Sequence, residues 1–218
     1  MTHPTWPLFD LRLSNADVAL RPMVEADLAT VAAILPDDLE LNPAATAYPG
    51  LDIATGRRVV AHQEYWQGWG RWSIASWVLT FVVEVDGRIV GTQTLEGEDF
   101  PMLRTVDSAS WLVPEARGQG VGKAMRTAVL ELAFGPLEAH RAITSAWEEN
   151  LSSLGVSRAV GYQPNGQYLH RRDGGAAVGD VIGSMVHLLL TREGWLSSTA
   201  GDGVTISGFE ACRPYFGV

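Results

Sequence analysis

Three glycines occupy the alternate positions 118, 120 and 122 in the stretch "WLVPEARGQGVGKAM", between an apolar strand-like run and a helix-like run. Because glycine has no Cβ, consecutive backbone N–H groups of such a loop can turn toward one point and form a nest that binds an anion. Arg117 and Lys123 add a cationic side chain at each end of the loop. The stretch therefore predicts an anion-binding loop held between a strand and a helix.

The segment after the loop has helical periodicity. Its apolar side chains recur at i, i+3, i+4 and i+7, namely at Met125, Ala128, Val129 and Leu132. This spacing predicts a helix over about 122–134, whose positive end would face the same anion.

Two familiar phosphate loops do not match this spacing. The dinucleotide fingerprint G-x-G-x-x-G needs a third glycine where the chain has Lys123. The P-loop needs a glycine where the chain has Arg117, and a Ser or Thr where it has Ala124. The loop therefore binds its anion in some other structural context.

The rest of the chain alternates between strand and helix patterns. Two β-rich runs, 77–85 and 88–96, flank Asp86-Gly87, a dipeptide that readily adopts a two-residue hairpin turn. Further strand patterns cover 17–23, 105–113 and 141–147, and helix patterns cover 24–35, 57–69 and 150–160. With 218 residues and 46% hydrophobic content, we expect a single α/β domain. The proline-rich stretch 36–70 resembles an insertion on the binding side.

Composition excludes several classes of protein. The one cysteine, Cys212, rules out a disulfide framework and is interpreted as a small buried apolar residue, and the N-terminus lacks a signal pattern, so we expect a cytoplasmic protein. The longest apolar runs are too short to span a membrane. A formal charge of −9 argues against nucleic acid and mildly favours a cationic acceptor. The histidines lack zinc-site spacing, so no metal is expected.

The hexapeptide "RGQGVG" resembles the R/Q-x-x-G-x-G/A pyrophosphate loop of the GNAT acetyltransferase superfamily. The order of segments, from "VALRPMVEADLATV" to "ENLSSLGVSRAVGY", is similar to that of its RimJ/RimL-like branch. The resemblance covers about 17–165 of a single domain spanning 1–218, and the strands and tail of 166–218 match more loosely. It implies a mixed, mostly antiparallel sheet flanked by helices, in which two neighbouring strands splay apart around acetyl-CoA.

The same resemblance assigns roles in binding acetyl-CoA. Backbone groups that would contact the acetyl and pantetheine portions belong to Trp111, Leu112 and Val113. The pyrophosphate would be held by Arg117, Gly118, Gln119, Gly120, Val121, Gly122 and Lys123.

The tetrapeptide "NLSS" resembles the N-x-x-S element of RimJ/RimL-like proteins, with Asn150 and Ser153 at the matching positions. An amide and a hydroxyl three residues apart on one helix face suit the pantetheine amide and the departing thiolate. Ser153 is therefore the candidate acid. Ordinary N-capping is the alternative, since both residue types are common caps.

An acceptor ammonium must lose its proton before it attacks a thioester. Asp107 lies where related proteins often have Glu, on the strand that leads to the thioester, and alternation puts it on the side of Ala109 and Trp111. Its short side chain leaves direct proton abstraction, a water relay and simple acceptor binding open. The rival carboxylates are Glu84, Glu96, Glu148 and Glu149.

We therefore expect an acetyl-CoA-dependent N-acetyltransferase that works by direct transfer, with a protein N-terminal or lysine amine as the favoured acceptor. A small-molecule enzyme for aminoglycosides or polyamines, and a non-catalytic acyl-CoA sensor, are the alternatives. A larger acyl donor and a homodimer remain open. Four tryptophans could line an acceptor pocket, although core positions are favoured for each: Trp66, Trp69, Trp72 and Trp77.

Overall fold

Nine strands form one sheet in the part of the chain that the computed structural model describes, residues 3–39, 48, 50–173 and 180–218. Their order is β7-β8-β6-β5-β4-β3-β2-β1-β9. The strands are β1 (Arg12–Asn15), β2 (Val18–Pro22), β3 (Trp77–Val85), β4 (Arg88–Gly97), β5 (Thr105–Leu112), β6 (Arg141–Trp147), β7 (Gln163–Asp173), β8 (Asp180–Thr191) and β9 (Thr205–Ser207). Among them β5 and β6 are parallel neighbours, and the other neighbouring pairs are antiparallel. The expected mixed, mostly antiparallel sheet is confirmed.

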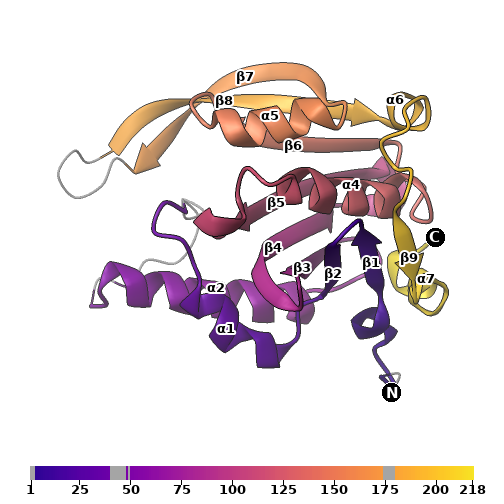
Figure 1. The fold of residues 1–218 in the computed structure, drawn as a ribbon, viewed down its shortest axis with the longest axis horizontal. Helices are drawn as coiled ribbons and strands as arrows, with labels where there is room; N and C mark the ends of the chain where they lie inside the picture. Colours follow the sequence, from indigo (N-terminus) through magenta and orange to yellow (C-terminus); the bar gives the residue numbers. More distant parts are fainter. Residues whose placement is uncertain (1–2, 40–47, 49, 174–179) are drawn as a thin grey trace.

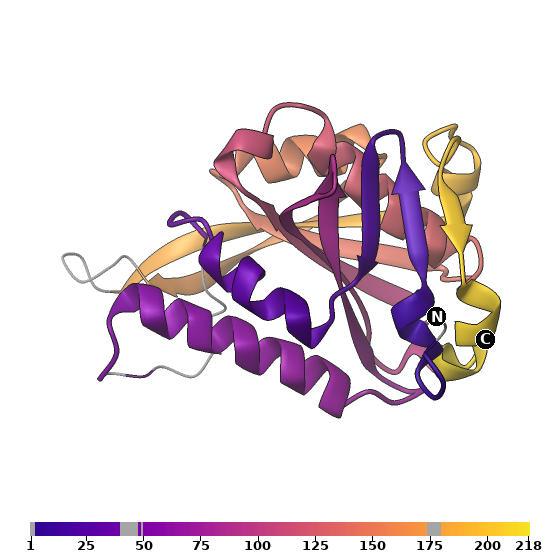
Figure 2. The same ribbon diagram turned by 60° about the horizontal axis from the view of Figure 1, so that its bottom comes forward.

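The helices lie on both sides of this sheet (Figures 1 and 2). They are α1 (Leu28–Ala33), α2 (Ile53–Gly70), α3 (Phe100–Leu103), α4 (Val121–Phe134), α5 (Leu151–Ala159), α6 (Arg192–Leu196) and α7 (Phe209–Phe216), with 3-10 turns η1 (Pro7–Asp10), η2 (Glu25–Asp27) and η3 (Pro114–Ala116). Helix α4 packs against β1, β2, β4, β6 and α5, whereas α1 and α2 pack against each other and contact β4 and β3. The sheet thus separates an α4 face from an α1/α2 face.

The predicted hairpin is confirmed in detail. Strands β3 and β4 pair from Trp77↔Gly97 to Val85↔Arg88, so two residues make the turn. Both of them have positive φ, 50° at Asp86 and 72° at Gly87. Positive φ at both central positions is the conformation that Asp-Gly adopts most easily.

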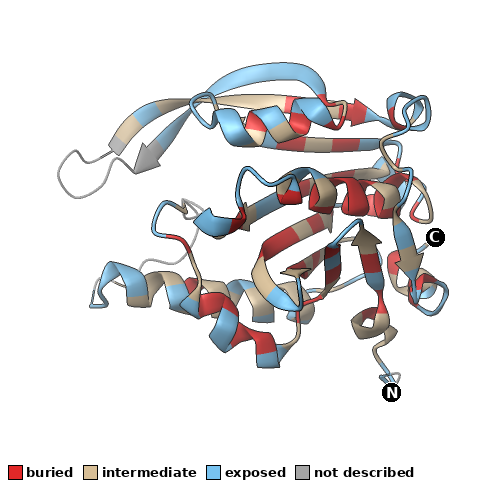
Figure 3. Cartoon of the chain, in the orientation of Figure 1, coloured by how far each residue is buried: buried red, intermediate tan, exposed pale blue. Residues whose placement is uncertain are grey.

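Helix α4 forms the centre of the main core, and Figure 3 shows it almost continuously buried. The predicted apolar positions, Met125, Ala128, Val129 and Leu132, are all at most 3% exposed. A smaller core of Met23, Leu28, Val31 and Val82 lies beneath α1 on the opposite face. Because both faces of the sheet are covered, alternate side chains of the strands between the two cores point toward one core or toward the other.

The N-terminal helices differ in length from the sequence prediction. The helix expected over 24–35 is a 3-10 turn followed by the short α1, which ends at Ala33 before Pro36. The helical pattern at 57–69 belongs to the longer α2, whose start is capped by Asp52 accepting from the Thr55 N–H at 2.9 Å. Residues 40–47 and 49 of the proposed insertion lie outside the described residues.

The C-terminal segment completes the sheet at both ends. Strand β8 pairs with β6, and β9 pairs with β1. Helix α7 lies beside the N-terminal segment, where the buried Cys212 thiol donates to the Pro7 carbonyl at 3.4 Å. Trp77 is 2% exposed in an aromatic cluster with Trp72 and Phe216, whereas Trp66 is 53% exposed. The core interpretation therefore holds for Trp77 and is wrong for Trp66.

Candidate functional site

The two parallel strands at the centre of the sheet separate along their length. Pairing of β5 with β6 covers Thr105↔Arg141 to Asp107↔Ile143 and ends there, although both strands continue. The last tie is a side chain, because the Thr144 hydroxyl donates to the Ser108 carbonyl at 2.9 Å. Beyond that point the backbone of β5 is open toward β6 (Figure 1). The neighbouring pair that the resemblance expected to splay is therefore β5 and β6.

The glycine loop lies at the open end of this splay, between η3 and α4. Gly118 and Gly120 have φ of 72° and 85°, and a Cβ at either position would meet no atom within 4 Å. Gly120 is the N-cap of α4, and among the described side chains none caps this helix start. The first N–H groups of α4 and its positive dipole end are thus free to bind an anion. The loop thus leaves open space at the start of α4, where the pyrophosphate is expected from the sequence.

Other loop side chains point in different directions. The Gln119 amide donates to the Glu115 carbonyl at 2.6 Å, and Lys123 is exposed. The Arg117 guanidinium donates to both carboxylate oxygens of Asp38 at 2.6 and 2.8 Å. This hydrogen bonding lowers the pKa of Asp38. Arg117 therefore ties the loop to the segment after α1, and an exposed pair of this kind is easily exchanged for another anion.

The strand before the loop offers fewer free backbone groups than expected. The Val113 N–H donates to the Val90 carbonyl at 2.9 Å, and the Leu112 carbonyl accepts from Arg117 Nε at 3.0 Å. Trp111 pairs with Thr92 in β4. Because backbone groups alternate in direction along a strand, those of Ser110 and Leu112 face the splay, whereas those of Trp111 face β4. Ser110 was not named from the sequence, although the alternation of backbone groups along a strand predicts that those of Ser110 face the same side as those of Leu112.

The "NLSS" element starts α5, on the β6 side of the splay. The Asn150 side chain accepts from the Ser153 N–H at 3.0 Å and from the Ser152 hydroxyl at 3.1 Å. Asn150 is thus a helix cap in this structure, as the alternative interpretation predicts. Ser153 is half-buried, and no described residue hydrogen-bonds its hydroxyl.

Two carboxylates meet on the α1/α2 face. Glu96 and Asp107 are register partners in β4 and β5, so their side chains share one face. Burial raises the pKa of both groups, and the nearby Asp107 raises that of Glu96 further. The Ser108 N–H donates to Asp107 at 2.6 Å. The structure therefore places the candidate base, Asp107, beside Glu96, one of the alternative carboxylates.

The other rivals lie elsewhere. Glu84 forms an ion pair with Arg21 at 3.1 Å. Glu148 and Glu149 are exposed residues just beyond the end of β6. Glu96 is consequently the rival best placed to assist Asp107.

A buried cation on the α4 face escaped the sequence analysis. Arg126 is 3% exposed, and its guanidinium donates to Ser110 on β5 at 3.3 Å and to Thr144 on β6 at 3.4 Å. The available signal was its position in the buried stripe of α4, four residues after Gly122 and three before Val129. A single arginine in such a stripe is normally expected to reach solvent.

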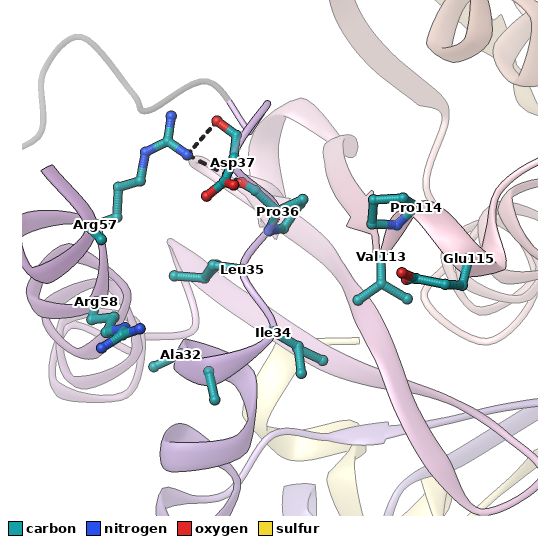
Figure 4. A pocket seen from close by; sticks show the side chains of 12 residues that line it. Ala32, Ile34, Leu35, Pro36, Asp37, Arg57, Arg58, Val113, Pro114 and Glu115 are labelled. Atoms are coloured by element: carbon teal, nitrogen blue, oxygen red, sulfur yellow. Dashed lines mark hydrogen bonds between the residues drawn. The ribbon is translucent and has the colours of Figure 1, made fainter.

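A cavity of about 500 Å³ opens beside the glycine loop on the α1/α2 side. It is lined by residues 32–37, by Ala54, Arg57 and Arg58 of α2, and by residues 113–115. Figure 4 shows Arg57 bonded to the backbone of the 36–37 segment, across the cavity from Glu115. None of Asp107, Asn150 and Ser153 lines it, so this cavity does not contain the predicted catalytic groups.

Within the described residues there is no group of three or more His, Cys, Asp or Glu side chains arranged to hold a metal ion. A separate search of the described helices found none that is long and apolar enough to cross a membrane.

Comparison with known proteins agrees with this geometry. A family model described as an acetyltransferase (GNAT) domain matches residues 17–163. Mycobacterium smegmatis RimJ, solved in complex with CoA-disulfide, is similar with a TM-score of 0.66 and 23% identity, covering 94% of this chain and 96% of that one. Mutant forms of the spermidine/spermine N-acetyltransferase SpeG from Vibrio cholerae are similar with a TM-score of 0.62 and 15% identity, covering 84% of this chain and 98% of that one. A GNAT-family acetyltransferase from Bacillus anthracis is similar with a TM-score of 0.60 and 16% identity, covering 84% of this chain and 99% of that one.

Proposed function

Because this chain belongs to the GNAT acetyltransferase family, we propose that it is a RimJ/RimL-like N-acetyltransferase that acetylates a protein N-terminal or lysine amine. The observation that carries this proposal is the glycine loop at the uncapped start of α4, at the open end of the β5/β6 splay. Members of the family use acetyl-CoA, whose thioester supplies an activated acyl carbonyl. The residues of this chain bind it, orient it and move the protons.

The glycine loop holds the pyrophosphate in this proposal. The N–H groups of Val121, Gly122 and Lys123 begin α4 and donate to the phosphate oxygens, while Gly118 and Gly120 leave the approach open. Arg117 joins them by exchanging Asp38 for a phosphate oxygen. The pantetheine arm lies in the splay, between the open edge of β5 and the start of α5, where Asn150 and Ser153 are located.

The two proton transfers of the reaction are assigned to two different side chains. On the α1/α2 face, Asp107 accepts the proton of the acceptor ammonium, directly or through water, and Glu96 beside it adds negative charge that attracts the cation. Near the α5 start, the Ser153 hydroxyl gives a proton to the departing thiolate and regains one, through water, from the second proton that the acylated nitrogen releases. The amine nitrogen bonds to the carbonyl carbon as the carbon–sulfur bond breaks, so the products are an amide and free coenzyme A.

An acceptor screen tests the proposal. Free thiol release from acetyl-CoA is measured with peptides bearing free N-termini, lysine peptides with blocked N-termini, spermidine and an aminoglycoside, and products are identified by mass spectrometry. We expect peptide-dependent turnover and a mass gain of one acetyl group on nitrogen. Turnover with spermidine or the aminoglycoside alone would make this a small-molecule enzyme. Binding of acetyl-CoA without thiol release above hydrolysis would make it a sensor.

A further inference from the structure

The guanidinium of Arg126 is buried and forms no ion pair with a described carboxylate, although it lies near enough to Asp107 to lower the pKa of that carboxyl. Its contacts are two long hydrogen bonds to neutral hydroxyls, Ser110 at 3.3 Å and Thr144 at 3.4 Å. Its Nε is buried and has no hydrogen-bond partner in the described chain. Burying an unpaired charge is costly. A buried guanidinium with an unsatisfied Nε and no ion pair is therefore suited to receive an anion that enters during function.

Two neighbouring hydroxyls also lack partners within the described residues. They are the buried Oγ of Ser108, two positions before Ser110 on the same face of β5, and the buried hydroxyl of Tyr162. Arg126 and Ser108 lie near the Tyr162 hydroxyl and partly offset the burial that raises its pKa, but no hydrogen bond of normal geometry joins either of them to it. The cluster therefore groups one arginine and two hydroxyls with donors that have no acceptor among the described residues.

The cluster lies at the inner end of the splay. Ser108 and Ser110 are nearer to the point where β5 and β6 pair, at Asp107, than residues 111–113, which are expected to meet the acetyl and pantetheine groups. Ser110 is exposed, whereas Arg126, Ser108 and Tyr162 are at most 4% exposed, so a ligand would reach the guanidinium from the Ser110 side. An acetyl group has no polar atom beyond its carbonyl and offers this arginine nothing. A short dicarboxylic acyl group ends in a carboxylate, which matches the planar fork of a guanidinium.

We propose that Arg126, with the hydroxyls of Ser108, Ser110 and Tyr162, forms a carboxylate-binding acyl subsite that selects coenzyme A thioesters of short dicarboxylic acids, such as succinyl-CoA. This inference rests on the proposed function, because it keeps the coenzyme A site and the amine acceptor and replaces only the acetyl group of the donor with a short dicarboxylic acyl group. The amine nitrogen bonds to the thioester carbonyl carbon, the carbon–sulfur bond breaks and the sulfur takes a proton. The distal carboxylate is unchanged, and the product is an amide that carries a negative charge.

Two other roles for Arg126 make different predictions. A structural brace between β5 and β6 would stabilise the fold without distinguishing one donor from another. A group that stabilises charge common to every transfer would affect acetyl and succinyl donors equally. Only a carboxylate subsite changes the ratio of affinities for the two donors.

Calorimetry with succinyl-CoA and acetyl-CoA measures this ratio without requiring turnover. We expect the wild-type protein to bind succinyl-CoA at least tenfold more tightly, about 1.4 kcal/mol, and Arg126→Met to bring the ratio close to one. Ser110→Ala, which keeps the guanidinium, should reduce the ratio partly and serves if Arg126→Met does not fold. Arg158→Met on the exposed surface of α5 is the matched control and should keep the wild-type ratio. Melting curves check that each variant is folded.

Equal affinity for both donors in the wild-type protein would overturn the subsite, as would a wild-type ratio in folded Arg126→Met. Failure to bind either thioester, or coenzyme A itself, would instead count against the proposed function. The two failures are therefore distinguishable in one set of titrations.

Discussion

Asp107 faces Glu96 across two paired strands, and this pairing decides how either carboxylate can act. Both groups are half-buried and have a raised pKa, chiefly through desolvation. Two like charges placed opposite each other in a sheet repel, so a cationic acceptor gains from entering between them. At a pH above its raised pKa, the Asp107 carboxylate is deprotonated and can accept a proton. Glu96, its register partner, places a second carboxylate near the bound cation.

Replacing Asp107 tests its assignment as the base. Because Asp107 is deprotonated only above its raised pKa, wild-type kcat/KM for the acceptor should rise with pH through that value. We expect Asp107→Asn to lose about 10²–10⁴-fold at low pH and to recover partly toward the acceptor's own pKa, about 8 to 10.4. Steady-state pH profiles make the measurement, with Glu96→Gln as the comparison on the same face. A wild-type profile in Asp107→Asn would move the role of base to Glu96.

Ser153 should fail in a different way, because thiolate charge develops only as the carbon–sulfur bond breaks. We expect Ser153→Ala to lower kcat more than about tenfold with little change in the KM for acetyl-CoA. Ser152→Ala is the control, since its hydroxyl belongs to an exposed residue and, among the described residues, bonds the capping Asn150. Similar kinetics in the two variants would leave Ser153 as a helix-cap or pantetheine contact, with water as the acid.

At the scale of elements, anion binding by the glycine loop is expected to depend on its backbone conformation more than on its side chains. Gly120 has a φ of 85° and open space where a Cβ would project. We expect Gly120→Glu to weaken coenzyme A binding at least tenfold, about 1.4 kcal/mol, because its side chain fills the phosphate approach with negative charge. Gly203→Glu is a matched control, with a φ of 88° and equally open space. Calorimetry on both folded variants decides, and equal affinities would contradict the phosphate nest.

Local signals predicted the elements that depend on neighbouring residues. Asp86-Gly87 specifies its hairpin because both residues tolerate positive φ, and the stripe of α4 follows from helical periodicity. The splay of β5 from β6 came only from the resemblance, because no local pattern encodes where a ladder ends. Arg117 pairs with Asp38 across 79 positions of sequence, and the buried Arg126 contacts Ser110 on β5 and Thr144 on β6. Such long-range outcomes lie beyond motif analysis.

At the scale of the whole molecule, the two ends of the chain close one side of the fold. Strand β9 pairs with β1, the Tyr215 hydroxyl donates to the Thr5 carbonyl at 3.1 Å, and Trp72 donates to the Tyr215 carbonyl at 3.1 Å. The tail, which the sequence connected only loosely to the family, is therefore packed against the N-terminal segment and the β3 hairpin. It should unfold together with the rest of the domain.

Truncating Phe216 tests whether the tail belongs to the same cooperative unit as the site. Phe216 is fully buried, and its ring lies 4.9 Å from that of Trp77 and 5.4 Å from that of Trp72. We expect Phe216→Ala to cost about 3–5 kcal/mol and to lower the melting temperature by roughly 10 °C, with one transition and unchanged coenzyme A affinity while folded. Leu196→Ala, at a position 64% exposed, should shift the melting temperature little. An early separate transition in Phe216→Ala, with the main transition unmoved, would mean that the tail folds independently of the acetyltransferase core.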